Sequence, residues 1–134
     1  MKRVRPGRSQ RGQAVVELSL VITVLLLLVL GLLAFGQIMH AYLSLTYASR
    51  EGARAAALQH SDADVRSAVA SALPPTIPQD EVTTTISPTE GERPRGTPVT
   101  VELRYRIPIA IPLLAQAIGR QEIVLVGRTT MRAE

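Results

Sequence analysis

A nearly continuous apolar run from Leu18 to Met39 constrains this chain more than any other feature. Its exceptions are Ser19, Thr23, Gly31, Gly36 and Gln37. About 20 apolar residues cross a bilayer as an α-helix, which rises 1.5 Å per residue. The run is longer than the apolar core of a signal peptide, and no A-x-A-like cleavage site follows it. We therefore expect one membrane-spanning helix that stays in the mature protein.

The charge distribution predicts how this helix is oriented. Five of the fifteen Lys and Arg residues precede the apolar run, which leaves ten against eleven acidic residues in the rest of the chain. The positive-inside rule keeps residues 1–12 in the cytoplasm as a basic leader and places the C-terminal part outside it. Because the basic residues lie beside a membrane helix, they do not indicate nucleic-acid binding, and we expect none.

The helix is predicted to continue beyond the membrane, over residues 13–59 in all. No proline interrupts the sequence between Ala41 and Leu58, and small or apolar residues recur there at helical spacing. They are Ala41, Leu45, Ala48, Gly52 and Ala55. This narrow stripe predicts that the second half of the helix packs against a folded domain.

Residues 60–134 predict a small extracytoplasmic α+β domain. A short second helix is expected over Ser61–Leu73, capped by Ser61 or Asp62 and ended by Pro74 and Pro75. Alternating apolar residues then predict strands over 82–86, 99–107 and 123–131. Since three strands bury too little surface alone, we expect an antiparallel sheet packed on the long helix.

The connection between the last two strands, residues 107–119, is mostly apolar ("IPIAIPLLAQAIG"). One interpretation is that it folds over the open side of the sheet as core. The other is a surface for the membrane or a neighbouring subunit. In the second case its candidate contact residues are Ile109, Ile111, Leu113 and Leu114.

No pattern of catalytic residues is present. The chain has no cysteine, and His40 and His60 lack a carboxylate pair at metal-ligand spacing. No phosphate-binding loop, nucleophile elbow or HExxH element occurs. We therefore expect no enzyme, no cofactor, no metal and no small-molecule substrate.

The densest polar motif is "REGAR" at 50–54. It indicates either a solvated helix face with a weak Glu51–Arg54 pair or a partner surface of Arg50, Glu51 and Arg54.

These features together resemble the TadE-like pseudopilins of the tight-adherence (Tad, or Flp) pilus system. The resemblance is carried by the basic leader ending "RG", then "QAVVEL", the apolar helix and "ASREGARAAA" at 48–57. It implies a pilin-like structural protein, with pilus biogenesis, adhesion and biofilm formation as its context. It implies cleavage by a prepilin peptidase between Gly12 and Gln13, with other pilins, the assembly platform and membrane lipid as partners. Leu18 stands where the family often has an aromatic residue.

Glu17 is the one carboxylate at the edge of the apolar run. It either reaches the aqueous interface, or it acts in assembly, where a neighbouring subunit's N-terminal amine would pair with it and fix the register. The main alternative function is an uncleaved, single-pass anchored binding module that never assembles. A mature N-terminus at Gln13, rather than Met1, distinguishes the pseudopilin from this module.

Overall fold

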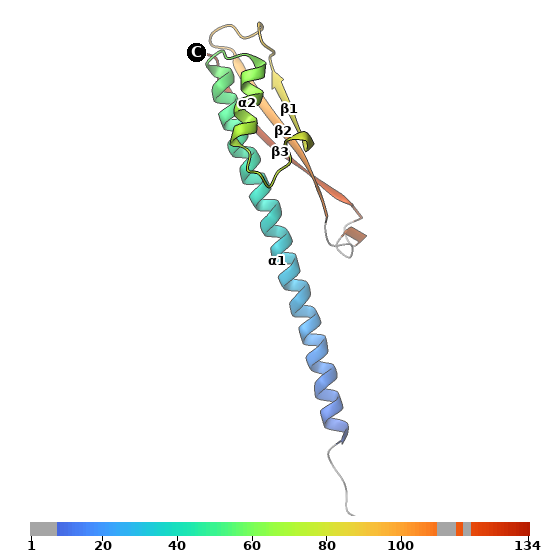
Figure 1. The fold of residues 1–134 in the computed structure, drawn as a ribbon. Helices are drawn as coiled ribbons and strands as arrows, with labels where there is room; N and C mark the ends of the chain where they lie inside the picture. Colours follow the sequence, from blue (N-terminus) through green and yellow to red (C-terminus); the bar gives the residue numbers. More distant parts are fainter. Residues whose placement is uncertain (1–7, 110–114, 117–118) are drawn as a thin grey trace, which may run out of the picture. The chain divides into compact units, whose positions relative to one another are not determined.

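The computed structural model describes residues 8–109, 115–116 and 119–134. In chain order they form two α-helices, a short 3₁₀ helix and three strands (Figure 1). The elements are α1 (Arg8–Ala57), α2 (Asp62–Ala72), η1 (Gln79–Glu81), β1 (Val82–Ser87), β2 (Pro98–Pro108) and β3 (Glu122–Arg132). The chain divides into two compact units, Met1–Gly36 and Gln37–Glu134. The α+β fold expected from the sequence is confirmed.

Helix α1 begins five residues before the expected start at Gln13 and runs without a break to Ala57. Arg and Gln are good helix formers, so nothing in residues 8–12 except Gly12 opposes helix there. At the other end, Gln59 takes a positive φ of 60°. The His60 N–H then donates to the Ala55 carbonyl and the Gln59 N–H to the Ala56 carbonyl, which satisfies the last carbonyls of the helix.

Helix α2 is close to the expected segment. The Ser61 hydroxyl accepts a hydrogen bond from the Asp64 N–H at 3.2 Å, so Ser61 is the N-cap. Leu73 is the C-cap, directly before Pro74. The buried residues of α2, Val65 and Val69, face the same side of the helix because they are four residues apart.

The three strands form one antiparallel sheet in the order β1-β2-β3. Thr84 lies opposite Leu103, and Leu103 lies opposite Gly127. Every second residue of β2 points inward and is buried from Val99 to Tyr105. The predicted alternation in this strand is therefore confirmed, and it gives the sheet one apolar face.

The hydrophobic core of unit Gln37–Glu134 lies between this face and the two helices. Four of the five stripe residues of α1 are fully buried or nearly so, among them Leu45 and Ala48 at 0% exposed. The strand β3 crosses α1 so closely that a Cβ on Gly127 would lie 2.7 Å from the Leu45 carbonyl oxygen. Ser49 and Thr129 share a hydrogen bond of 2.7 Å at the same crossing. Glycine at 127 thus allows sheet and helix backbones to approach.

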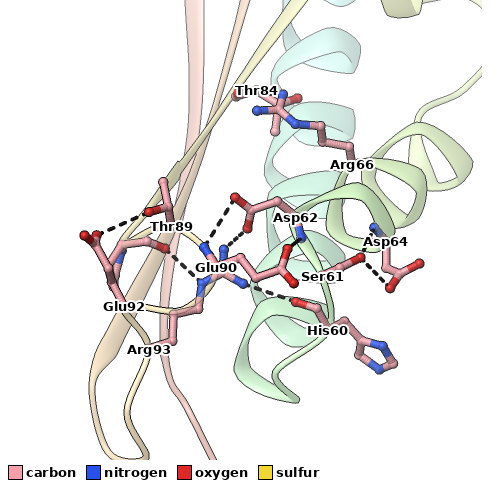
Figure 2. A network of polar contacts seen from close by, with 11 residues as sticks. His60, Ser61, Asp62, Asp64, Arg66, Thr84, Thr89, Glu90, Glu92 and Arg93 are labelled. Atoms are coloured by element: carbon pink, nitrogen blue, oxygen red, sulfur yellow. Dashed lines mark hydrogen bonds and ion pairs between the residues drawn. The ribbon is translucent and has the colours of Figure 1, made fainter.

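Arg93, in the loop between β1 and β2, is buried and binds residues at the junction of the two helices (Figure 2). The Arg93 side chain is 4% exposed and forms an ion pair with Asp62. Its Nε donates to the Pro88 carbonyl at 2.9 Å and its Nη1 to the His60 carbonyl at 3.3 Å. The Glu90 carboxylate accepts from the Asp62 N–H at 3.1 Å. This network connects the β1–β2 loop to the start of α2 and to the residues that follow α1.

Candidate assembly and membrane site

The first half of α1 presents apolar side chains to its surroundings on every side. Leu25 is 58% exposed and Leu32 is 71% exposed, and their neighbours along the helix are similar. Among the described residues, α1 is the helix that is long and apolar enough to cross a membrane, by length and composition. Exposed apolar surface of this extent requires apolar surroundings, because each buried CH₂ group contributes about 0.8 kcal/mol. This half of α1 therefore has the length and the exposed apolar surface that a membrane anchor needs, and it is called the anchor below.

Two of the polar residues in the anchor are satisfied within the helix itself. The Ser19 hydroxyl donates to the Val15 carbonyl and the Thr23 hydroxyl to the Ser19 carbonyl, each at 2.8 Å. Glu17 differs from them. It is exposed, and no ion pair joins it to another of the described side chains. Glu17 is therefore an exposed carboxylate at the edge of the anchor.

The proposed processing position is open to approach. Gly12 and Gln13 are exposed residues of α1, and a Cβ built on Gly12 would have no atom of the described chain within 4 Å, apart from its own helix turn. Gln13 and Glu17 are four residues apart and therefore lie on one face of the helix. The structure thus aligns Gln13 with Glu17, whereas the cleavage itself stays a prediction.

The "REGAR" residues have different surroundings. Arg50 and Arg54 are exposed on α1, Glu51 is partly buried, and Gly52 is buried against Val69 of α2. Glu51 and Arg54 form no ion pair in the described part of the chain. In this motif Arg50 and Arg54 thus face away from the domain, whereas Gly52 allows α1 and α2 to pack closely.

The structure describes residues 107–109, 115–116 and 119 of the apolar connection. Ile107 is partly buried and packs on the core, and Ile109 is also partly buried. The Ile109 N–H donates to the Gln121 carbonyl at 2.9 Å, which extends the pairing of β2 with β3 by one residue pair. Ile111, Leu113 and Leu114 lie outside the described residues, so the choice between core and partner surface stays open for them.

Within the described ranges, no group of three or more His, Cys, Asp or Glu residues is arranged to hold a metal ion. Tyr105 of β2 is one of the buried residues of the core. Burial, and after it the Glu81 carboxylate, raises the pKa of Tyr105 above its usual 10.0. Its hydroxyl therefore stays protonated at neutral pH and acts as a neutral polar group.

Sequence reasoning missed the residues that hold the domain together. Arg93 and Arg95 lie in the same turn-rich segment, "SPTEGERPRGTP", and only the fold distinguishes the buried one from the exposed one. Gly127 interrupts an apolar strand, which is a signal of close backbone approach. The glycine inside the strand predicted over 123–131 could therefore have indicated the close approach of this strand to α1.

Comparison with known proteins supports the resemblance found in the sequence. The model of the family described as "TadE-like protein" matches residues 12–54, which cover the proposed processing position, the anchor and "REGAR". No curated protein and no solved structure matches the chain. The fold and site define a protein with a long apolar N-terminal helix and a helix-plus-sheet domain. Over residues 12–54 the chain is similar to TadE-like proteins.

Proposed function

We propose that this chain is a minor pilin-like (pseudopilin) component of a Tad-type pilus assembly or secretion system, and that it contributes to pilus biogenesis, adhesion and biofilm formation. One observation carries the proposal. The first half of α1 is apolar on all sides while the second half is built into a folded domain. Such a helix suits lipid before assembly and neighbouring apolar helices in a fibre afterwards, since both surroundings bury the same surface.

The proposed topology follows from the basic leader, with residues 1–12 in the cytoplasm and unit Gln37–Glu134 outside it. The anchor enters the fibre by leaving lipid sideways, so the domain never has to cross the membrane again. Lipid, other pilins and the assembly platform are the partners on this proposal. The exposed Arg50 and Arg54 of α1 are positioned to contact acidic groups of a neighbouring subunit.

Processing is the first test of the proposal. We expect the protein from its native host to begin at Gln13, as measured by intact-protein mass spectrometry, because a prepilin peptidase removes residues 1–12. Since Gly12 and Gln13 lie inside α1, the peptidase must unwind the first turns, and Gly12 makes this easier. A host that lacks the peptidase is the control, and there the chain should keep Met1.

A protein that keeps Met1 in the native host would instead support the alternative function. It would be an uncleaved, single-pass anchored binding module, because an amine at Gln13 would never form. The variant Gly12→Val sharpens the test, since it leaves the anchor unchanged while it crowds the scissile bond. We expect it to insert into the membrane and to stay uncleaved.

The second test concerns Glu17. After cleavage the new amine of Gln13 lies one helical turn from Glu17 on the same face. A neighbouring subunit displaced along the fibre by about one turn, roughly 5.4 Å, would bring its amine beside this carboxylate. Because an unpaired charge in apolar surroundings is costly, pairing would favour docking in one register.

Glu17→Ala and Glu17→Gln should therefore insert and be cleaved normally but be recovered with sheared surface fibres or partner pilins at a level lower by about tenfold, as expected for one charged hydrogen-bonded contact. Ser19→Ala is the matched control, because the Ser19 hydroxyl bonds within its own helix. If both Glu17 variants assemble like the parent chain, Glu17 has no role in register.

A further inference from the structure

The end of unit Gln37–Glu134 that contains Gln37 lies where the apolar run of α1 ends. Gln37, His40 and Ala41 line a cavity of about 320 Å³ together with residues of β2 and of the segment after α2. Those residues are Thr76, Ile77, Tyr105 and Ile107. Since the apolar run of α1 ends at Met39, residues that share a cavity with Gln37 and His40 lie beside the end of this run, where a bilayer-spanning helix would reach the membrane surface. The last residues of β2 and the first residues of β3 therefore lie beside the end of this run too.

The outer face of the sheet changes character along its length. Near the membrane end, Val124 is 51% exposed and Val126 is 42% exposed. Their partners in the register are arginines, Arg106 opposite Val124 and Arg104 opposite Val126. Toward the other end the same face is polar, with Thr100 and Thr130 joined by a hydrogen bond of 2.8 Å. The exposed valines are thus confined to one end of the face, whereas exposed arginines continue along it to Arg128 and Arg132.

The two arginines are able to reach an anionic partner. The side chain of Arg106 is 73% exposed, and its ion pair with Glu122 is long, at 4.0 Å. The side chain of Arg104 is 61% exposed, and its Nε bonds Glu102 while the rest of its guanidinium remains outward. A guanidinium binds phosphate oxygens through two parallel hydrogen bonds, which makes arginine well suited to lipid headgroups.

We propose that this face, formed by Val124, Val126, Arg104 and Arg106, rests on the lipid headgroup layer, with the valines against the acyl boundary and the arginines on phosphate groups. The partner is a phospholipid surface, and an anionic one binds better. Exposed apolar side chains flanked by basic ones are typical of interfacial membrane contacts. Because α1 already tethers the domain to the bilayer, even a weak contact has a high effective concentration. The proposal requires the α1 anchor but not a role in a pilus.

The absence of cysteine from the sequence allows a direct test with single labels. The full chain is placed in nanodiscs at one copy per disc, with an environment-sensitive fluorophore on Val124→Cys. The matched control is Thr130→Cys, on the same face of β3 and about 20 Å away at roughly 3.3 Å per residue. Both positions are exposed, so both labelled proteins should unfold at the same temperature as the parent.

Lipids brominated near the headgroup should quench the label at 124 by at least about twice as much as the label at 130, as expected for an interfacial contact. Equal quenching at the two positions would overturn the proposal. So would a blue shift at 124 that appears only with two copies per disc and without bromolipid quenching, because the face would then belong to a second copy of the chain.

The arginines are tested in the same labelled protein. With Arg104→Gln and Arg106→Gln together, quenching at 124 should fall in anionic discs toward the value seen in zwitterionic discs, since the phosphate contacts are lost. If the double variant is quenched like its parent in anionic discs, the arginines do not bind lipid phosphate and that part of the proposal is wrong.

Discussion

The two halves of α1 belong to one helix but are stabilised by different means. Residues before Gly36 are exposed on all sides, and Leu25 is typical at 58% exposed. Residues after Gln37 bury a narrow stripe, in which Leu45 is 0% exposed. In the first half the surroundings must come from lipid or from other subunits. In the second half the chain supplies its own apolar surroundings through α2 and the sheet.

This difference explains why the residue types differ between the halves. The anchor uses large side chains, mostly Leu and Val, which maximise contact with lipid tails. The packed half uses Ala41, Ala48 and Gly52, which allow other backbones to come close. A glycine or alanine in the second half is therefore a packing requirement, whereas a glycine in the first half meets nothing. Substitutions in the two halves of α1 and in the sheet that packs on it test this contrast.

Replacement of a leucine by alanine should give the largest difference in unfolding free energy between the two halves of α1. Leu45→Ala leaves a cavity in the core and should lower the free energy of unfolding of unit Gln37–Glu134 by about 2–5 kcal/mol. Leu25→Ala is the matched control in the same helix, and it should change this free energy by less than about 0.5 kcal/mol because the Leu25 side chain is exposed and its truncation leaves no cavity. Chemical denaturation of the full chain in detergent micelles measures both. Equal losses would mean that the anchor and the domain unfold as one unit.

Adding a single methyl group to a glycine should give the second largest contrast. Gly127→Ala places a Cβ at 2.7 Å from the Leu45 carbonyl oxygen and must push β3 away from α1. Overpacking of this kind costs about 1–3 kcal/mol. The same denaturation measurement detects the loss.

The control is Gly36→Ala, where the added Cβ meets no atom within 4 Å beyond its own helix turn. Alanine favours a helix over glycine by about 1 kcal/mol, so this variant should not lower stability. If Gly127→Ala is as stable as Gly36→Ala, the close approach of β3 to α1 is not a constraint on the sequence.

Local patterns predicted the elements well and their contacts less well. The stripe from Ala41 to Ala55 and the alternation from Val99 to Ile107 were correct because periodicity directly reports which face is buried. The partners of Arg93 were not predictable. They come from α2 and two loops, and long-range contacts leave no trace in a local pattern.

The candidate site shows the same limit. Glu17 and Gln13 are four residues apart, so the sequence alone aligned them on one face. The sequence predicted a strand over 123–131 but did not indicate that Val124 and Val126 lie on its outer face. Their importance depends on Arg104 and Arg106 of the neighbouring strand, and this pairing requires the register.

The smallest effect is expected from the exposed ion pairs on the outer face of the sheet, and it sharpens the contrast with the buried core. Hydrogen bonding by Arg104 holds the pKa of Glu102 below its ordinary 4.5, although desolvation opposes this, and the charges of Arg104 and Arg128 lower it further. The bonds are 2.6 Å from the Arg104 Nε and 3.3 Å from the Arg128 Nε. Because the pKa is lower in the folded state, this contribution to stability is present above pH 4.5 and is lost as the pH falls through the folded-state value.

Glu102→Gln should remove this part of the acid sensitivity. Its loss of unfolding free energy at neutral pH should be well below that of Leu45→Ala, since exposed ion pairs contribute little. Thermal unfolding of both proteins across the acid range measures it, and identical pH profiles for parent and variant would show that Glu102 keeps its ordinary pKa in the folded domain.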